Sequence, residues 1–207
     1  ACPARALTLE ADAVVWDSEL CTGCDTCIGT CTYRSSPRIR HMDAREVFAE
    51  VSSYQPFIRG VTASGGECML YPEFLLELFG LCRAAGIGAL IDSNGTIDFS
   101  EHEGLLNVAD GVMIDVKAWS DAWFVHLTGT DGATVRKNLA FLAERDKLEE
   151  VRVIVTEGWN DPEDAVDGIA ATLGRRVGAA RLRLMRFRHF GVRGPMASAP
   201  SPSDARM

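Results

Sequence analysis

Four cysteines stand within eleven residues near the start of the chain, in CTGCDTCIGTC at residues 21–31. They are separated by two, two and three residues, and a further cysteine, Cys2, is followed directly by Pro3. Gly23 and Gly29 allow the tight backbone turns that aim several sulfurs inward. A loop of this kind can surround one cofactor, and it constrains the local fold more than any other feature of the sequence.

The spacing C-x2-C-x2-C-x3-C is typical of bacterial ferredoxins, in which the fourth cysteine of one run ligates the other of two clusters. A proline commonly follows that fourth cysteine, so Cys2 is interpreted as the last member of an earlier run whose first three cysteines lie before Ala1. By this crossing rule Cys31 serves a second cluster. One [4Fe–4S] cluster is then predicted on Cys2, Cys21, Cys24 and Cys27.

Zinc and simple buried thiols are the alternative interpretations of the cysteine run. Zinc sites usually show two separated C-x2-C pairs, whereas here three cysteines follow one another at one step. Thr32, and not proline, follows Cys31, which departs from the ferredoxin pattern. The stretch ALTLEADAVVWDSEL at 6–20 has the alternation of a strand, a turn and a strand.

The composition is that of a folded, acidic protein. Of the 207 residues 47% are hydrophobic and 24% are charged, and the net charge is −8, so a buried core is expected and a nucleic-acid partner is not. No apolar run reaches the length of a membrane span, and no signal peptide is expected. The odd number of cysteines, seven, indicates reduced metal chemistry in the cytoplasm and not a disulfide framework.

Beyond residue 40 the pattern alternates between helices and strands. Asp43 is predicted to cap the first helix, with Glu46 as its capping-box partner. Strands are predicted at 58–64, 87–93, 111–116, 151–157 and 181–187, and helices at 71–86, 133–146 and 162–174. Strands joined by crossover helices form a parallel sheet, either open or curled into part of a barrel. The tail from Gly194 is rich in proline, serine and alanine and is predicted to be loose.

Polar residues and glycines gather where the predicted strands end, which is where parallel sheets bind their ligands. Alternation along a strand places Asp115 and Lys117 on one side, and Asp92 and Asn94 show the same step. Together with Glu67 they predict a polar cup for a ligand that carries an amine, a carboxylate and a ribose. An ordinary glycine turn and a surface ion pair are the alternative interpretations.

Six stretches carry a family resemblance: VTASGGECMLYPEFLLELFGLCRAAGIGALIDSNG, MIDVKAW, HLTG, VRKNLAFL, VRVIVTEGWND and LMRFRHFG. In this order they cover nearly all of 2–194 and resemble the radical S-adenosylmethionine (SAM) superfamily. Within it they are similar to the glycyl-radical-enzyme activating proteins related to pyruvate formate-lyase activase, and FRHFGVRG is similar to the YjjW-type branch. The resemblance implies an α/β fold with three parts. These are an incomplete ferredoxin-type [4Fe–4S] insert at 1–40, a partial (β/α) barrel without its first strand at 41–194, and a loose tail at 195–207.

The resemblance also implies roles for the strand-end residues. The motif that holds the amino group of SAM matches Ser64, Gly65, Gly66 and Glu67. Asp92, Ser93 and Asn94 match a strand end near the SAM carboxylate. A D-x-K motif beside SAM matches Asp115 and Lys117, and an arginine that reaches the cofactor matches Arg152. Where a relative has a histidine that contacts the ribose, this chain has Arg188 followed by His189, so that contact is left open.

The catalytic cysteine motif of the superfamily, C-x3-C-x2-C, does not occur in these 207 residues. In the family its three thiolates hold a cluster with one open iron, which SAM chelates. Cys68 and Cys82 stand too far apart for the motif and are interpreted as packing thiols. We therefore expect an N-terminal segment outside this chain that carries the first strand, the catalytic loop and three more ferredoxin-type cysteines, and we expect the chain alone to be inactive.

The implied function is that of an activating enzyme. A reduced cluster cleaves SAM to methionine and a 5′-deoxyadenosyl radical, and this radical takes hydrogen from a glycine of a partner glycyl-radical enzyme. A flavodoxin or a ferredoxin-type protein is the implied electron donor. Two alternatives stay open, namely a radical SAM enzyme that acts on another substrate and an iron–sulfur electron-transfer module without catalysis.

Overall fold

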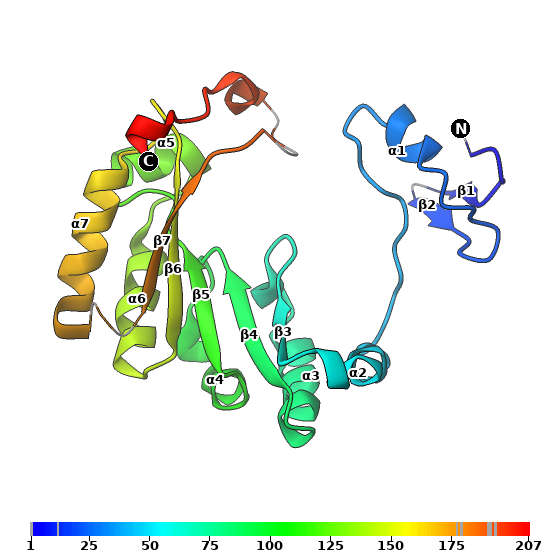
Figure 1. Cartoon of the computed structure of the whole chain (residues 1–207), viewed down its shortest axis with the longest axis horizontal. Coiled ribbons are helices and arrows are strands. Elements are labelled where there is room, and N and C mark those ends of the chain that lie inside the picture. Colours follow the sequence, from blue (N-terminus) through cyan, green and yellow to red (C-terminus); the bar gives the residue numbers. More distant parts are fainter. Residues whose placement is uncertain (1, 12, 177, 179, 190–191, 193) are drawn as a thin grey trace. The chain divides into compact units, whose positions relative to one another are not determined.

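The structure is a computed structural model of the chain, and it describes all residues except 1, 12, 177, 179, 190–191 and 193. The chain divides into two compact units. The first comprises Ala1–Met42 with Phe190–Gly194, and the second comprises Asp43–His189 with Pro195–Met207. Each unit has its own secondary structure (Figure 1).

The first unit is a β-hairpin followed by the cysteine run. β1 (Leu7–Glu10) pairs antiparallel with β2 (Ala13–Trp16), with Leu7 opposite Trp16, as the alternation of the sequence predicts. The cysteine run contains the short helix α1 (Thr26–Thr30). Gly23 and Asp25 have φ angles of 69° and 57°, so the backbone enters the left-handed region on both sides of Cys24.

The second unit alternates strands with helices and short 3₁₀ turns, which are labelled η. From residue 44 the elements are α2 (Ala44–Ser53), η1 (Gln55–Phe57), β3 (Gly60–Ala63), η2 (Cys68–Leu70), α3 (Pro72–Ala84), β4 (Gly88–Ser93), η3 (Phe99–Glu101), α4 (Glu103–Val108), β5 (Gly111–Asp115), α5 (Asp121–Thr128), α6 (Ala133–Glu144), β6 (Leu148–Val155), α7 (Pro162–Leu173), η4 (Gly174–Arg176), β7 (Arg181–Arg186), η5 (Gly194–Ser198) and η6 (Asp204–Arg206). The predicted capping box is confirmed, because the Asp43 carboxylate accepts from the Glu46 amide and Glu46 accepts from the Asp43 amide.

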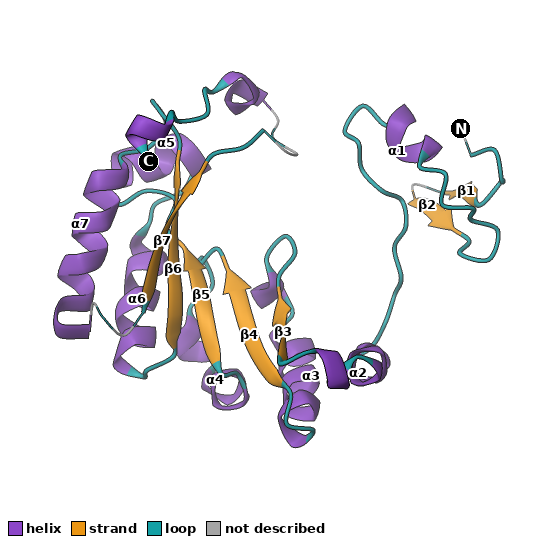
Figure 2. Ribbon diagram, in the orientation of Figure 1, coloured by secondary structure: helices purple, strands orange, loops and turns teal. Residues whose placement is uncertain are grey.

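The five strands of the second unit form one parallel sheet in the order β3-β4-β5-β6-β7 (Figure 2). Neighbours in the sheet are also neighbours along the chain, and each connection between two successive strands contains at least one α-helix. Because parallel strands need such crossovers, all strands end at the same edge of the sheet. The predicted α/β class with a parallel sheet is confirmed in this part of the chain.

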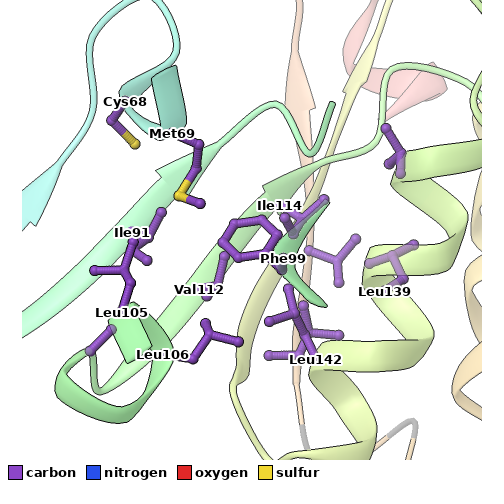
Figure 3. Packing of buried hydrophobic residues seen from close by; sticks show 14 of the residues in the cluster. Cys68, Met69, Ile91, Phe99, Leu105, Leu106, Val112, Ile114, Leu139 and Leu142 are labelled. Carbon is purple, nitrogen blue, oxygen red and sulfur yellow. The ribbon is translucent and has the colours of Figure 1, made fainter. Parts of the chain in front are cut away.

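The two faces of the sheet differ in chemistry, because successive side chains of a strand alternate between them. One face is apolar, with Ile91, Ile114 and Val151 buried against the crossover helices. Figure 3 shows how Phe99, Leu139 and Leu142 pack with the residues of this face. The other face carries charged side chains at the carboxyl ends of its strands. The apolar core therefore holds the strands in place, while these charged side chains lie on the opposite face of the sheet.

Four segments differ from the sequence prediction. β6 begins at Leu148, three residues before the predicted strand at 151–157. The helices α4 and α5 are not among the predicted elements, because short helices of six and eight residues leave too little periodic pattern to detect. The tail, predicted to be loose, forms η5 and η6. Its Ser201 hydroxyl donates to the Phe187 carbonyl at 3.0 Å, and Asp204 forms an ion pair with Arg186.

Across the residues that the structure describes, no helix combines the length and the apolar character needed to cross a membrane.

Candidate functional site

The loop that follows β3 begins the strand-end site. Ser64, Gly65 and Gly66 are exposed, and Glu67 is half-buried. Gly65 has a φ angle of 131°, a conformation that L side chains rarely adopt. A Cβ atom built on Gly65 or Gly66 would meet no protein atom within 4 Å. The backbone of this loop is therefore open to a ligand on its exposed side.

Glu67 links the end of β3 to the end of β4. Its Oε1 accepts hydrogen bonds from Ser93 Oγ at 2.8 Å and from the Met69 amide at 3.0 Å, and its Oε2 accepts from the Asn94 amide at 2.8 Å. An ionised carboxylate offers about four lone-pair sites, so one acceptor position, on Oε2, is left for an ammonium donor. Ser93 thus lies beside Glu67, and its buried hydroxyl also accepts from the Gly95 amide.

Asn94 turns away from Glu67 and stabilises its own loop. Its Oδ1 accepts from the amide and the hydroxyl of Thr96, at 2.9 and 2.7 Å. The following loop is held from α6 by Asn138, which is fully buried, donates to the Gly95 and Ile97 carbonyls and accepts from the Phe99 amide. The Asn94 side chain therefore bonds within its own loop, while its backbone amide donates to Glu67.

Four charged side chains form a network at the ends of β4 and β5 and on the adjacent part of β6. Arg152 pairs with Asp92, and its Nε lies 3.0 Å from Asp115 Oδ1. Lys117 Nζ donates to Asp115 Oδ2 at 2.7 Å. Asp115 and Lys117 lie on the same side of the chain, as the alternation predicts. They also form the ion pair that was the alternative interpretation of these residues. We call Glu67 together with these four residues the strand-end cup.

A second layer of this network was missed from the sequence. Glu150 lies in β6 and is only 4% exposed. Its carboxylate is 3.4 Å from the Arg183 guanidinium and 4.0 Å from Arg152 Nε. Burial and the neighbouring Arg183 lower the pKa of Arg152, although a guanidinium stays charged in proteins. The sequence does contain a signal for this arrangement, because charged residues alternate along two strands that pair, at 150 and 152 and at 181 and 183. The strand predicted at 151–157 begins one residue too late to include Glu150.

Lys117 is positioned by a buried asparagine that follows β6. The Asn160 amide donates to the Lys117 carbonyl at 3.0 Å and to the Ile154 carbonyl at 2.7 Å, and its oxygen accepts from the Thr156 amide. Since Asn160 is only 7% exposed, these three bonds fix the backbone at the end of β5 relative to the end of β6.

The two cysteines of this unit are both buried. The Cys68 thiol donates to the Asp92 carbonyl at 3.3 Å, and burial together with the Glu67 charge raises its pKa to about 11. Burial also raises the pKa of Cys82, which has no exposed surface. Their interpretation as packing thiols agrees with this environment. They do not form a ligand triplet, and among the described residues no group of three or more metal-ligating side chains is arranged to hold a single metal ion.

The first unit contains a cavity lined by four of its five cysteines. It is bordered by Trp16, Arg38 and the thiol-bearing residues Cys2, Cys21, Cys24 and Cys27, whereas Cys31 is not among the lining residues. This set is the one that the crossing rule assigned to a single cluster. Arg38 forms an ion pair with Asp25 at the cavity. We call this space the cysteine cavity.

Three thiols of the cysteine run have a lowered pKa. For Cys21 the main cause is the indole N–H of Trp16, for Cys24 it is the Thr26 side chain at 3.3 Å, and for Cys31 it is a backbone hydrogen bond from Ser35. Thiolates are the form that binds iron. Four sulfurs around one cavity, with donors nearby, fit the chemistry of an iron–sulfur cluster.

The two residues left open by the sequence, Arg188 and His189, follow β7. His189 Nε2 lies 2.7 Å from the Ala199 carbonyl and packs edge-on against Phe187. Arg188 is exposed. Neither makes a contact with the strand-end cup in the part of the chain that the structure describes.

The model of the radical SAM superfamily matches residues 19–167. The chain belongs to the radical SAM superfamily. The match includes all four cysteines of the run at 21–31, Glu67, and the strands β4, β5 and β6. The resemblance to this superfamily that the sequence indicated is thereby confirmed.

Two curated relatives of this radical SAM chain are activating enzymes. It is 34% identical over 195 residues to the pyruvate formate-lyase-activating enzyme of Listeria monocytogenes, covering 86% of this chain and 75% of that protein. It is 27% identical over 158 residues to the pyruvate formate-lyase 1-activating enzyme of Escherichia coli, covering 73% of this chain. The chain spans 64% of the length of that relative. A solved domain of the pyruvate-formate lyase-activating enzyme from Bacteroides vulgatus shares the fold, with a TM-score of 0.57 at 22% identity over 70% of this chain and 86% of that chain.

Proposed function

We propose that this chain carries the SAM-binding cup and an auxiliary iron–sulfur site of a cytoplasmic glycyl-radical-enzyme activating enzyme. The observation that carries the proposal is the strand-end cup, in which Glu67 and Arg152 connect the ends of neighbouring parallel strands of a radical SAM chain. The activating enzymes among its relatives support the choice of reaction.

The cup offers complementary groups for each polar part of SAM. The remaining acceptor position on Glu67 suits the ammonium group, and the open backbone of Gly65 and Gly66 allows close approach. Lys117 and Arg152 are cations for the carboxylate, and Asp92 and Asp115 are acceptors for ribose hydroxyls. In the structure these four charges pair with one another, so SAM would exchange some of these ion pairs for its own.

The catalytic cluster of the superfamily has no complete ligand set in this chain. The 207 residues contain no C-x3-C-x2-C, and Cys68 and Cys82 are buried singly. When bound, a reduced cluster supplies the electron that splits SAM into methionine and a 5′-deoxyadenosyl radical, which takes a hydrogen atom from the glycine Cα. The role of the residues described here is to bind and orient SAM and to keep water from its reacting end.

The auxiliary cluster is a separate part of the proposal. Its ligands would be the four residues around the cysteine cavity, Cys2, Cys21, Cys24 and Cys27. The proposed partners are a glycyl-radical enzyme as protein substrate and a flavodoxin or ferredoxin-type electron donor. The four-thiol cavity, standing in a unit of its own, favours an electron-transfer module as the second candidate function.

The decisive experiment uses the longest reading frame that contains this chain, reconstituted with iron and sulfide under anaerobic conditions. Incubation with SAM, a reductant and a glycyl-radical enzyme should give 5′-deoxyadenosine and a glycine-centred EPR signal. The variants Glu67→Gln and Asp115→Asn should lower both yields at least tenfold at limiting SAM, while Glu77→Gln on the exposed face of α3 serves as control. Deoxyadenosine formed without a glycyl radical would indicate another substrate, and an iron-loaded protein that never cleaves SAM would indicate the electron-transfer module.

A further inference from the structure

A buried indole N–H lies beside the cysteine cavity, and among the described residues it makes no hydrogen bond of full geometry. Trp16 is the last residue of β2, opposite Leu7, and its side chain lines the cavity together with four cysteines. Its Nε1 is buried and, among the described residues, has no acceptor at full hydrogen-bond geometry. Leaving a buried N–H unpaired is destabilising, so such a group in a native protein calls for an explanation such as a bound ligand or a functional role.

Cys21 is the cavity cysteine that stands nearest to Trp16 along the chain, after a turn in which the Asp17 carboxylate accepts from two backbone amides. Both residues line the cysteine cavity, and the indole N–H lowers the pKa of the Cys21 thiol. Two other polar neighbours of the run already have partners, since Arg38 pairs with Asp25 and Thr26 contacts Cys24. Trp16 therefore brings to the cavity a donor that lacks a partner at full hydrogen-bond geometry among the described residues.

We propose that Trp16 is a positioning residue of the auxiliary cluster, whose indole N–H donates a hydrogen bond to Cys21 Sγ when that sulfur ligates iron. This inference rests on the auxiliary cluster of the proposed function. A hydrogen bond to a ligating sulfur stabilises the additional negative charge of the reduced cluster, and such bonds are among the features that set cluster potentials. Trp16 thus raises the reduction potential of the cluster.

The proposal also favours one role for the auxiliary cluster. A buried donor that bonds to one ligating sulfur affects the reduced state more than the oxidised state. Such a bias has a consequence only where the cluster changes oxidation state. Trp16 therefore favours an electron-relay role over a purely structural role in docking a partner.

The test compares Trp16→Phe with the wild-type chain, both reconstituted anaerobically, and with Trp123→Phe in α5 as a matched control. Phenylalanine keeps an aromatic ring in the hairpin but removes the N–H. We expect unchanged iron content and about a tenfold lower ratio of reduced to oxidised cluster at a fixed solution potential, which for a one-electron couple is a shift of about 59 mV to more negative potential. The control should leave the potential unchanged.

Equal potentials for Trp16→Phe and wild type at equal iron content would overturn the inference. Failure of the wild-type chain to bind iron would instead refute the auxiliary cluster itself, so the two failures are distinguishable. If the phenylalanine variant loses its cluster, wild-type protein labelled with ¹⁵N in the tryptophan indole decides the question. Its reduced cluster should show a ¹⁵N hyperfine coupling in pulsed EPR, and absence of that coupling would overturn the inference.

Discussion

Arg152 stands directly beside Asp115 in the register of β5 and β6, with its Nε 3.0 Å from Asp115 Oδ1. The same guanidinium pairs with Asp92 on β4, and Lys117 neutralises the other oxygen of Asp115. Neither Arg152 Nε nor Asp115 Oδ1 reaches full hydrogen-bond geometry. One cation thus connects the ends of three parallel strands while retaining hydrogen-bonding capacity that a ligand can use.

Replacing Arg152 with methionine should destabilise the second unit. The variant leaves the half-buried carboxylates Asp92 and Asp115 close together with only Lys117 as a counter-charge, and loss of one partner from a buried pair costs roughly 3–5 kcal/mol. Partial exposure of these side chains reduces the expected loss to about 2 kcal/mol. Urea unfolding measures it, and Arg45→Met, which removes the exposed ion pair with Glu77, should cost less than about 1 kcal/mol. Equal losses would show that the network does not link the strands.

The strand ends could be predicted from the sequence because two rules act there together. Alternation fixed the side of Asp115 and Lys117, and the order of strands and helices brought the ends of β3, β4 and β5 to one edge. The contacts of Glu67 could not be predicted in the same way. Its three hydrogen bonds depend on the left-handed turn at Gly65 and on the position of Ser93, which are properties of the packed loop and not of a local pattern.

The residues that were missed share a physical reason. Glu150 and Arg183 are charged residues in strands, and a charge in a strand is usually exposed, so its burial follows only from its neighbours across the sheet. Trp16 is an aromatic residue at the end of a hairpin strand, where packing is the ordinary expectation. Its relation to Cys21 requires the hairpin to lie against the cysteine run, which no periodicity encodes.

Gly168 and Gly80 give a matched pair of helix substitutions with opposite expected signs. Alanine normally stabilises a helix interior relative to glycine by up to about 1 kcal/mol. In α7, however, a Cβ on Gly168 would stand 2.0 Å from the Trp119 indole, whereas in α3 a Cβ on Gly80 meets nothing within 4 Å. Gly168→Ala should therefore destabilise by about 1–3 kcal/mol through overpacking, and Gly80→Ala should stabilise. Thermal unfolding tests both, and stabilisation by Gly168→Ala would mean that Trp119 does not pack against α7.

Cys68 and Cys82 should resist alkylation in the folded, iron-free chain. Thiolates are the reactive form, and the pKa of Cys68 is raised to about 11 by burial and by Glu67, while Cys82 is fully buried with a raised pKa. Cys24 is exposed and provides the internal comparison. Peptide mapping after brief treatment with iodoacetamide near neutral pH should show Cys24 modified and both buried thiols intact. Modification of Cys68 at the rate of Cys24 would contradict its packed environment, and denaturant should equalise all three.

Asp98 should make part of the stability of the second unit dependent on acid pH. Its carboxylate accepts from Lys137 Nζ at 2.5 Å and from the Ser100 amide and hydroxyl, and these bonds, chiefly that from Lys137, lower its pKa from 3.8 to about 2. Since the folded state has the lower pKa, it binds the proton more weakly than the unfolded state. The stabilisation is therefore complete above about pH 4 and is lost as the pH falls through about 2.

The variants Asp98→Asn and Lys137→Met isolate this contribution. Because the pair lies near the surface and solvent screens it, Asp98→Asn should cost no more than about 1 kcal/mol at neutral pH. The difference between wild type and Asp98→Asn, measured by urea unfolding at several pH values, should shrink as the pH is lowered from 4 toward 2. In the Lys137→Met background the main cause of the lowered pKa is gone, so the pH dependence of that difference should flatten. A difference that stays constant across this pH range in both backgrounds would show that Asp98 titrates alike in the folded and unfolded chain.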